Sequence, residues 1–99
     1  SGEKYQWTIH ITSAQRSGLV MDIATALNSI NAVVHSINAR DLMAQGLSVA
    51  TITVEVKNLE GLRSIMHRLG GIRGVLEVLR AGRKSKIRRL SAESGGKKE

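Results

Sequence analysis

The clearest pattern in the chain is an alternation of apolar and polar side chains near its N-terminus. The apolar positions are Tyr5, Trp7, Ile9 and Ile11, and the polar positions between them are Gln6, Thr8, His10 and Thr12. Residues two apart point to the same face of a strand. The pattern therefore predicts a strand over residues 5–12 with one buried face.

A turn and an amphipathic helix are predicted next. Gly18 allows a turn that other residues resist, and Ser17 is placed to be the N-cap, with its hydroxyl accepting from a first-turn N–H. The helix is expected to run to about Ile30. Its predicted stripe, at three- and four-residue spacing, is Leu19, Val20, Ile23, Ala24, Leu27 and Ile30.

Two further strands follow, joined by a hairpin loop. We expect the first over residues 33–42, with a blurred alternation that does not show which face is buried. Met43–Gly46 is short and contains glycine, as a hairpin loop should. The second runs over residues 47–57 and alternates clearly. Ala50, Ile52, Val54 and Val56 share one face, and Val49, Thr51, Thr53 and Glu55 share the other.

The last elements are a second helix and a short strand. Asn58 is a plausible N-cap for a helix over residues 59–69, which Gly70 and Gly71 are expected to end. The apolar stripe of this helix is Leu59, Leu62, Ile65, Met66 and Leu69. A fourth strand is predicted over residues 75–80.

The order β-α-β-β-α-β predicts an α+β, ferredoxin-like fold. Right-handed crossovers place both helices on one face of a four-stranded antiparallel sheet. The other face would show Val49, Thr51 and Thr53 with part of the second strand. Because this face is expected to be poor in charge, we expect it to be covered, most simply by a second copy in a two-fold dimer.

Length and composition narrow the classes of protein to which this chain can belong. Ninety-nine residues form one domain, and the absence of cysteine excludes disulfide and thiolate chemistry. The sequence contains neither a signal-peptide pattern nor an apolar run long enough for a bilayer. We expect an intracellular, cytoplasmic protein with no membrane partner.

The net charge of +7 is concentrated at the C-terminus. Residues 81–99 hold seven basic and two acidic residues, a net of +5, whereas residues 1–80 carry +2. We divide the chain into a leading linker (1–4), a folded domain (5–80) and a basic, disordered tail (81–99). The tail either contacts nucleic acid or is a solvated terminus. The candidate contacts are Arg83, Lys84, Lys86, Arg88 and Arg89.

Catalytic chemistry is not predicted. His10, His35 and His67 lack metal-type spacing, the carboxylates are not paired for acid–base work, and no serine has a nucleophile-elbow context. We therefore expect a protein that is not an enzyme and that needs no cofactor or metal. An RNA reader of the RRM type would need aromatic side chains on its central strands, and residues 47–56 have none.

The turn Gln15–Val20 is the best candidate for a binding site. A helix start leaves N–H groups unpaired and carries partial positive charge, so it can receive a carboxylate or a phosphate. The alternative is an ordinary strand-to-helix turn.

Over residues 5–80 the chain resembles the ACT domain family. The family pattern has a hydrophobic strand, then Asp-Arg-x-Gly-Leu-Leu, a helix, and an Asn followed by an apolar residue opening the second strand. The matching segments are Gln15–Ile23, Ile30–Val33 and the closing strand Gly74–Arg80. Ile37–Arg40, Ala50–Val54 and Asn58–Leu62 look most like the C-terminal ACT domain of RelA/SpoT-type (p)ppGpp synthetase/hydrolases.

The resemblance implies a regulatory domain of a stringent-response enzyme, a GTP pyrophosphokinase or ppGpp hydrolase, whose end takes part in ribosome and tRNA sensing. Family ACT domains often bind an amino acid at a homodimer interface, between the first turn and a partner's second strand. The residues matching these regions are Gln15, Arg16, Ser17, Gly18, Leu19, Val20, Asn31 and Val33. Gln15 stands where the family has an acid, which favours apolar, branched-chain ligands. The alternatives are RNA or ribosome contact through the tail and a plain dimerisation domain.

Overall fold

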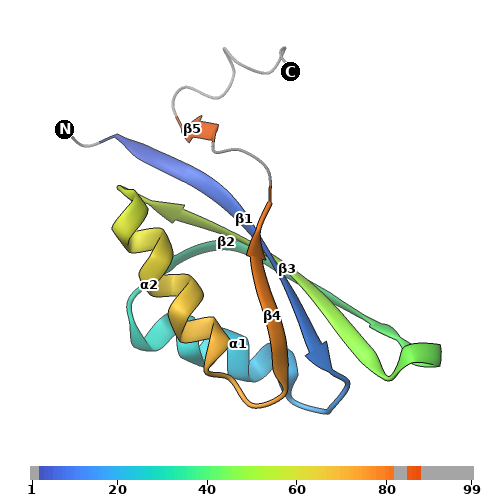
Figure 1. Cartoon of the computed structure of the whole chain (residues 1–99). Helices are drawn as coiled ribbons and strands as arrows, with labels where there is room; N and C mark the ends of the chain where they lie inside the picture. The colour runs from blue at the N-terminus through green and yellow to red at the C-terminus, as the bar shows by residue number, and fades with distance from the viewer. Residues whose placement is uncertain (1–2, 82–84, 88–99) are drawn as a thin grey trace.

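The computed structural model describes residues 3–81 and 85–87. Its elements follow the predicted βαββαβ order, and one short strand is added at the end. They are β1 (Lys4–Ala14), α1 (Leu19–Ser29), β2 (Val33–Leu42), the 3-10 helix η1 (Met43–Gln45), β3 (Leu47–Val56), α2 (Leu59–Gly70), β4 (Val75–Arg80) and β5 (Ser85–Ile87). The ferredoxin-like α+β prediction is confirmed (Figure 1).

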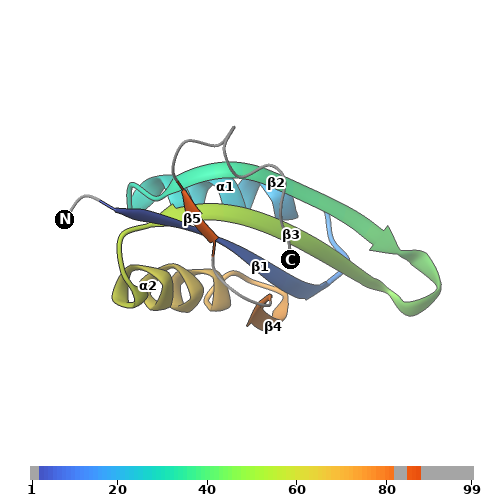
Figure 2. The same cartoon turned by 90° about the horizontal axis from the view of Figure 1, so that it is seen from above.

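The sheet has the strand order β2-β3-β1-β4, and all of these pairings are antiparallel. The central strands β1 and β3 pair continuously from Tyr5 opposite Val56 to Ala14 opposite Leu47. Seen from above, the sheet is strongly twisted, and the β2–η1–β3 hairpin extends beyond the helices (Figure 2). The twist is the normal right-handed one of β-strands.

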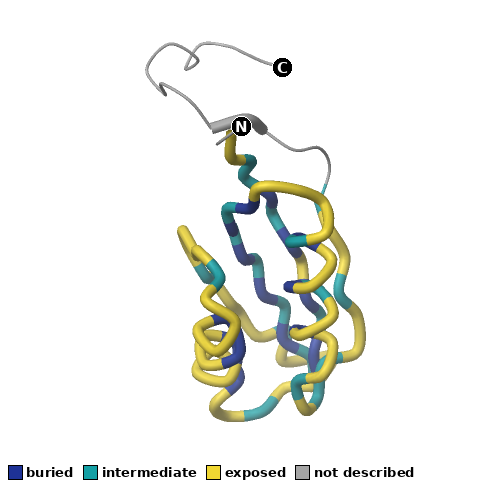
Figure 3. Tube along the Cα trace, turned by 90° about the vertical axis from the view of Figure 1, so that its left-hand side faces the viewer, coloured by how far each residue is buried: buried dark blue, intermediate teal, exposed yellow. Residues whose placement is uncertain are grey.

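The core lies between the sheet and the two helices. Trp7, Ile9 and Ile11 of β1 and Ala50, Ile52, Val54 and Val56 of β3 are buried there, as the alternation predicts. Leu27 of α1 and Leu62 and Leu69 of α2 are fully buried against them. Burying one such leucine stabilises the fold by about 1.5 to 3 kcal/mol. Figure 3 shows the buried residues in the central strands and on the inward sides of the helices.

The predicted stripe of α1 is partly wrong. Leu19, Ile23 and Leu27 are buried, and so is Ala26, which was not in the stripe. Val20 and Ile30 are exposed, by 45% and 36%, and Ala24 is exposed as well. The reason is that α1 lies beside the outer strand β2, and the described chain has no element beyond it to cover the outer flank of the helix.

The start of α1 corrects the predicted cap. Its N-cap is Gly18 in the left-handed conformation, with φ 81°, and among the described residues no side chain caps the helix. A residue that caps a helix with its side chain normally has an extended backbone. Gly18 has a left-handed backbone and no side chain, so it cannot cap in this way. Asn58, by contrast, is extended, and its Oδ1 accepts from the Gly61 N–H at 2.8 Å, as predicted for α2.

Helix α2 continues one residue past the predicted end, through Gly70, and its C-cap Gly71 has a φ of −87°. The left-handed glycine that commonly ends a helix is therefore not used here. The left-handed glycine in this loop is Gly74, with φ 93°, immediately before β4.

The blurred pattern of β2 has a structural cause. The pairing with β3 shifts between Val34, opposite Val54, and Ser36, opposite Thr53. His35 is thus an extra residue, and such a bulge changes which side chains share a face. Almost every residue of this edge strand is exposed, including Val33 at 52%.

The open face of the sheet, opposite the helices, bears Val49, Thr51 and Thr53 as predicted, and all three are half-buried. The expectation that this face is poor in charge is wrong. The strand register also places Arg40 and Glu77 on it, in line with Val49. Those two charges lie on the outer strands β2 and β4, and for β2 the sequence pattern does not show which face is buried.

The tail departs from the expectation of disorder at one place. Ser85–Ile87 forms β5, which pairs with Lys4–Gln6 beside the end of β4. The rest of the segment predicted to be disordered, except Ala81, lies outside the described residues. Within the described part of the chain, no helix has the length and apolarity needed to cross a bilayer.

Candidate functional site

The Gln15–Val20 turn is held in place from two sides. The Ala14 N–H donates to the Gly74 oxygen at 2.8 Å, and the Gln15 N–H donates to the Gly46 oxygen at 3.0 Å. The turn is therefore tied to the loop before β4 and to the tip of the β2–β3 hairpin. These main-chain bonds fix the position at which α1 begins.

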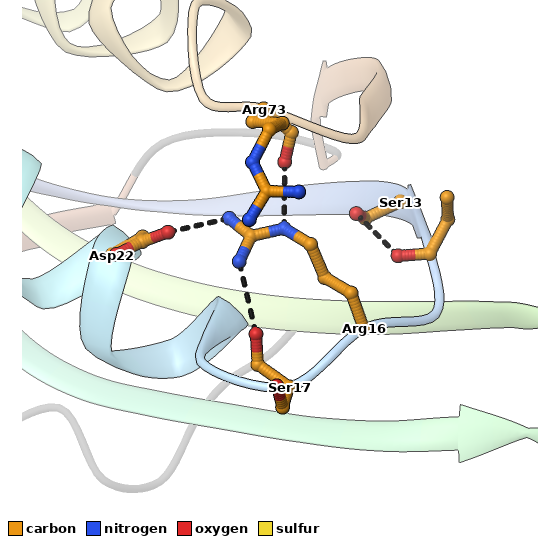
Figure 4. Close-up of polar contacts among 6 residues, drawn as sticks. Ser13, Arg16, Ser17, Asp22 and Arg73 are labelled. Atoms are coloured by element: carbon orange, nitrogen blue, oxygen red, sulfur yellow. Dashed lines mark hydrogen bonds and ion pairs between the residues drawn. The ribbon is translucent and has the colours of Figure 1, made fainter.

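Arg16 is engaged within the protein (Figure 4). Its Nη2 lies 2.6 Å from Asp22 Oδ2 in the first turn of α1, and its Nη1 donates to the Ser17 oxygen at 3.0 Å. Its Nε donates to the Arg73 oxygen at 2.9 Å. The side chain is only 13% exposed. Arg16 therefore acts first as a positioning residue that joins the turn, the helix and the loop before β4.

The first turn of α1 is open. Its first intrahelical bond runs from the Asp22 N–H to the Gly18 oxygen at 2.9 Å. The N–H groups of Leu19, Val20 and Met21 precede that bond and therefore have no acceptor within the helix. A hollow of about 300 Å³ lies at this point. Its lining comprises Arg16, Gly18, Leu19, Val20, Met21, Ala39, Arg40, Asp41 and Ser48.

Gln15, which was predicted as a ligand contact, lies outside that lining. Its Nε2 is 3.5 Å from Asp41 Oδ2 and 3.3 Å from Met43 Sδ, so the side chain points toward the hairpin. The carboxylate within the hollow is Asp41, whose Oδ1 accepts from the Ser48 hydroxyl at 2.6 Å.

Sequence reasoning missed Asp41 and Ser48. One signal was available, because Ser48 is a polar residue at a core-facing position of β3 and is 3% exposed. Its partner in the register, Ser13, is fully buried on β1. A buried hydroxyl on each of two paired strands marks the end of the apolar core.

Asn31 and Val33 lie far from the turn within one chain. They follow the C-terminal end of α1, whereas Gly18 precedes its N-terminal end. Eleven residues of helix span about 16 Å at 1.5 Å per residue. Asn31, with a left-handed φ of 56°, and Val33 border a different hollow of about 300 Å³ between α1, β3 and α2.

The carboxyl group of Glu55, on β3, has a lowered pKa. The His35 Nε2–H donates to Glu55 Oε1 at 3.0 Å, and Lys4 Nζ lies 3.5 Å from Oε2. The hydrogen bond from His35, helped by Lys4, lowers the pKa of the Glu55 carboxyl. In the described part of the chain, no cluster of His, Asp and Glu could hold a metal ion.

The nucleic-acid alternatives rest on other surfaces. Trp7 is buried on the helix-facing side and Tyr5 packs against the same core, so neither is offered to a base on the open face. Among the predicted tail contacts, Arg83, Lys84, Arg88 and Arg89 lie outside the described residues. Lys86 lies in β5.

A protein-family model described as "ACT domain" matches residues 1–80 of the sequence. The chain therefore belongs to the ACT domain family. No curated protein gives a significant match to the sequence.

Solved structures with this fold come from several enzymes. The crystal structure of the ACT domain from GTP pyrophosphokinase of Chlorobium tepidum is 20% identical, with a TM-score of 0.68 over 79% of this chain and 99% of that chain. The acetolactate synthase small subunit from Thermotoga maritima is 16% identical, with a TM-score of 0.67 over 76% and 46% of the two chains. At these identities the likeness concerns the fold.

Proposed function

We propose that this ACT domain binds an amino acid between two copies of the chain and thereby regulates the enzyme that carries it. The observation that carries the proposal is the open first turn of α1 beside the hollow lined by Asp41. The unpaired N–H groups of Leu19 and Val20 suit the ligand carboxylate. Asp41 supplies the negative charge for the ammonium group that the family acid, replaced here by Gln15, would otherwise supply.

A second copy at the β2 edge completes this site. A two-fold axis perpendicular to the sheet at that edge places the two α1 helices side by side and antiparallel. The turn of one copy then lies beside the partner's Asn31 and Val33. The exposed apolar side chains Val20, Met21 and Val33 support this edge as the interface and favour a branched-chain ligand.

The ligand site is tested by titrating the ¹⁵N-labelled chain with the common amino acids, branched-chain ones included. We expect amide shifts at Ser17–Val20, at Asn31–Val33 and around Asp41, and none elsewhere. The variant Asp41→Asn should weaken binding at least tenfold, whereas Glu60→Gln, an exposed acid on α2, should leave it unchanged. If no amino acid shifts the Ser17–Val20 amides, the domain is not an amino-acid sensor.

We further propose that the parent enzyme is a (p)ppGpp synthetase/hydrolase of the stringent response. The support is the resemblance of Ile37–Arg40 and Ala50–Val54 to the ACT domains of such enzymes and the shared fold with the Chlorobium GTP pyrophosphokinase domain. The test is to incubate the full-length protein with ATP and GTP to measure (p)ppGpp synthesis, and separately with (p)ppGpp to measure its hydrolysis. Absence of both synthesis and hydrolysis would leave this domain with a different parent.

A further inference from the structure

The open face of the sheet carries two opposite charges at the ends of one row. In the register, Arg40 on β2 lies opposite Val49 on β3, Val49 opposite Thr12 on β1, and Thr12 opposite Glu77 on β4. Three strand spacings separate the charges by about 14 Å, too far for a direct pair. Both residues are exposed, and neither has an ion pair with any described residue.

The neighbouring row combines a hollow with an exposed apolar side chain. Here Asn38, Thr51, His10 and Leu79 lie opposite one another in the same strand order. A hollow of about 400 Å³ covers both rows on the β2 side. Leu79, at the β4 end of the row, is 52% exposed.

We propose that this face binds a second copy of the chain, face to face, about a two-fold axis that runs parallel to the strands midway between β3 and β1. Rotation about this axis lays β2 of one copy over β4 of the other and keeps each residue at its level along the strands. Arg40 then faces the partner's Glu77, and Glu77 faces the partner's Arg40. Stacked sheets lie about 10 Å apart, a distance that an arginine and a glutamate reaching toward each other can bridge.

The same rotation matches shape as well as charge. Leu79 lands over the partner's Asn38, at the rim of the hollow, and Val49 lands over the partner's Thr12. A two-fold axis across the strands, through the row of Thr51, would instead lay Arg40 over the partner's Ser36 and leave both charges unpaired. The charges therefore select one axis among those that bring the two faces together.

This interface differs from the ligand-binding edge, although Arg40 also lines the hollow beside α1. It uses the open face, whereas the edge interface uses the outer side of β2 and α1, so one chain can engage both. The inference rests on the strand register and does not depend on amino-acid binding.

Charge reversal tests the pairing in the full chain. Sedimentation equilibrium should show that Arg40→Glu and Glu77→Arg each raise the dissociation constant of one association step at least tenfold, because each reversal creates two like-charge pairs. The double variant Arg40→Glu/Glu77→Arg should return that constant to within threefold of the wild type. Arg63→Glu and Glu60→Arg on α2 carry the same charge changes away from this face and should leave it unaltered.

A second variant addresses the shape match. Leu79→Ser should weaken the same association step, and circular dichroism should show all variants folded.

A wild-type chain that stays monomeric would overturn the proposal. So would reversals that leave association unchanged, or a double variant that remains as impaired as the single ones. Amide shifts with amino acids should persist in Glu77→Arg, because Glu77 lies outside the hollow beside α1, and this separates the result from any failure of the ligand site.

Discussion

The Nε–H of Arg16 donates a hydrogen bond of 2.9 Å to the main-chain oxygen of Arg73. This bond joins the turn before α1 to the loop before β4, two segments that are far apart in the sequence. Figure 4 shows the same guanidinium reaching Asp22 and Ser17. A ligand that displaced the turn would therefore also disturb the loop that leads to β4.

Replacing Arg16 by lysine should destabilise the domain. Lysine keeps the charge but is a single compact ammonium group, so it cannot make the three directed bonds of the planar guanidinium. We expect Arg16→Lys to lower the free energy of unfolding by about 1 to 3 kcal/mol, measured by urea denaturation. Arg63→Lys, at an exposed position on α2, is the control and should change stability little.

Two glycines with left-handed backbone should differ in their tolerance of alanine. A Cβ at Gly46 (φ 66°) meets nothing within 4 Å, so Gly46→Ala should cost only the backbone penalty of about 1 to 2 kcal/mol. A Cβ at Gly74 (φ 93°) would lie 3.3 Å from Ser13 Oγ and 3.4 Å from Arg16 Nε. Gly74→Ala should therefore cost more than Gly46→Ala in thermal unfolding. Equal losses would mean that the Arg16 side chain moves aside freely.

The N-cap of α2 can be tested alone. Asn58→Ala removes the acceptor of the 2.8 Å bond from the Gly61 N–H and should lower stability by about 1 kcal/mol. Asn58→Asp keeps an acceptor and should stay near the wild type. Loss of stability in the aspartate variant as large as in the alanine variant would show that the cap bond is not the cause.

The lowered pKa of the Glu55 carboxyl predicts a pH dependence of stability. Because the folded pKa is below the unfolded one, ionised Glu55 stabilises the fold above the unfolded pKa, and this contribution is lost as the pH falls through the folded value. Wild type should exceed Glu55→Gln in stability at neutral pH, and the gap should close in acid. His35→Ala should raise the pKa of Glu55, followed by carboxyl ¹³C shifts, because the His35 hydrogen bond is the main cause of the lowering.

Most of the fold could be predicted from the sequence because its central strands have one buried face. In β3, Ala50 and Ile52 are buried while Thr51 and Thr53 are half-buried, and this alternation is visible in the sequence. The bulge at His35 could not be predicted, because the extra residue is defined by the pairing with β3. The strand β5 was missed because the tail has the composition of a disordered segment.

The candidate site could be predicted only in outline. The sequence predicts the turn because a glycine stands between a strand and a helix. It favours Ser17 as the cap because it does not reveal the left-handed backbone of Gly18. Arg16 could not be recognised as an internal clamp, since its acceptor on Arg73 comes from a distant loop. Asp41 lies on β2, and the sequence pattern does not show which face of this strand is buried. Its place in the lining of the hollow therefore could not be predicted.

The central claim is that a second copy at the β2 edge completes the site, and one measurement tests it directly. Within one chain Val20 and Val33 lie at opposite ends of α1, too far apart for a nuclear Overhauser effect. A mixture of ¹³C-labelled and unlabelled chains, with a saturating branched-chain amino acid, should give an isotope-filtered effect between Val20 methyl groups of one copy and those of the partner's Val33. Its absence, while the Ser17–Val20 amides still shift with the ligand, would show that one chain binds the amino acid alone.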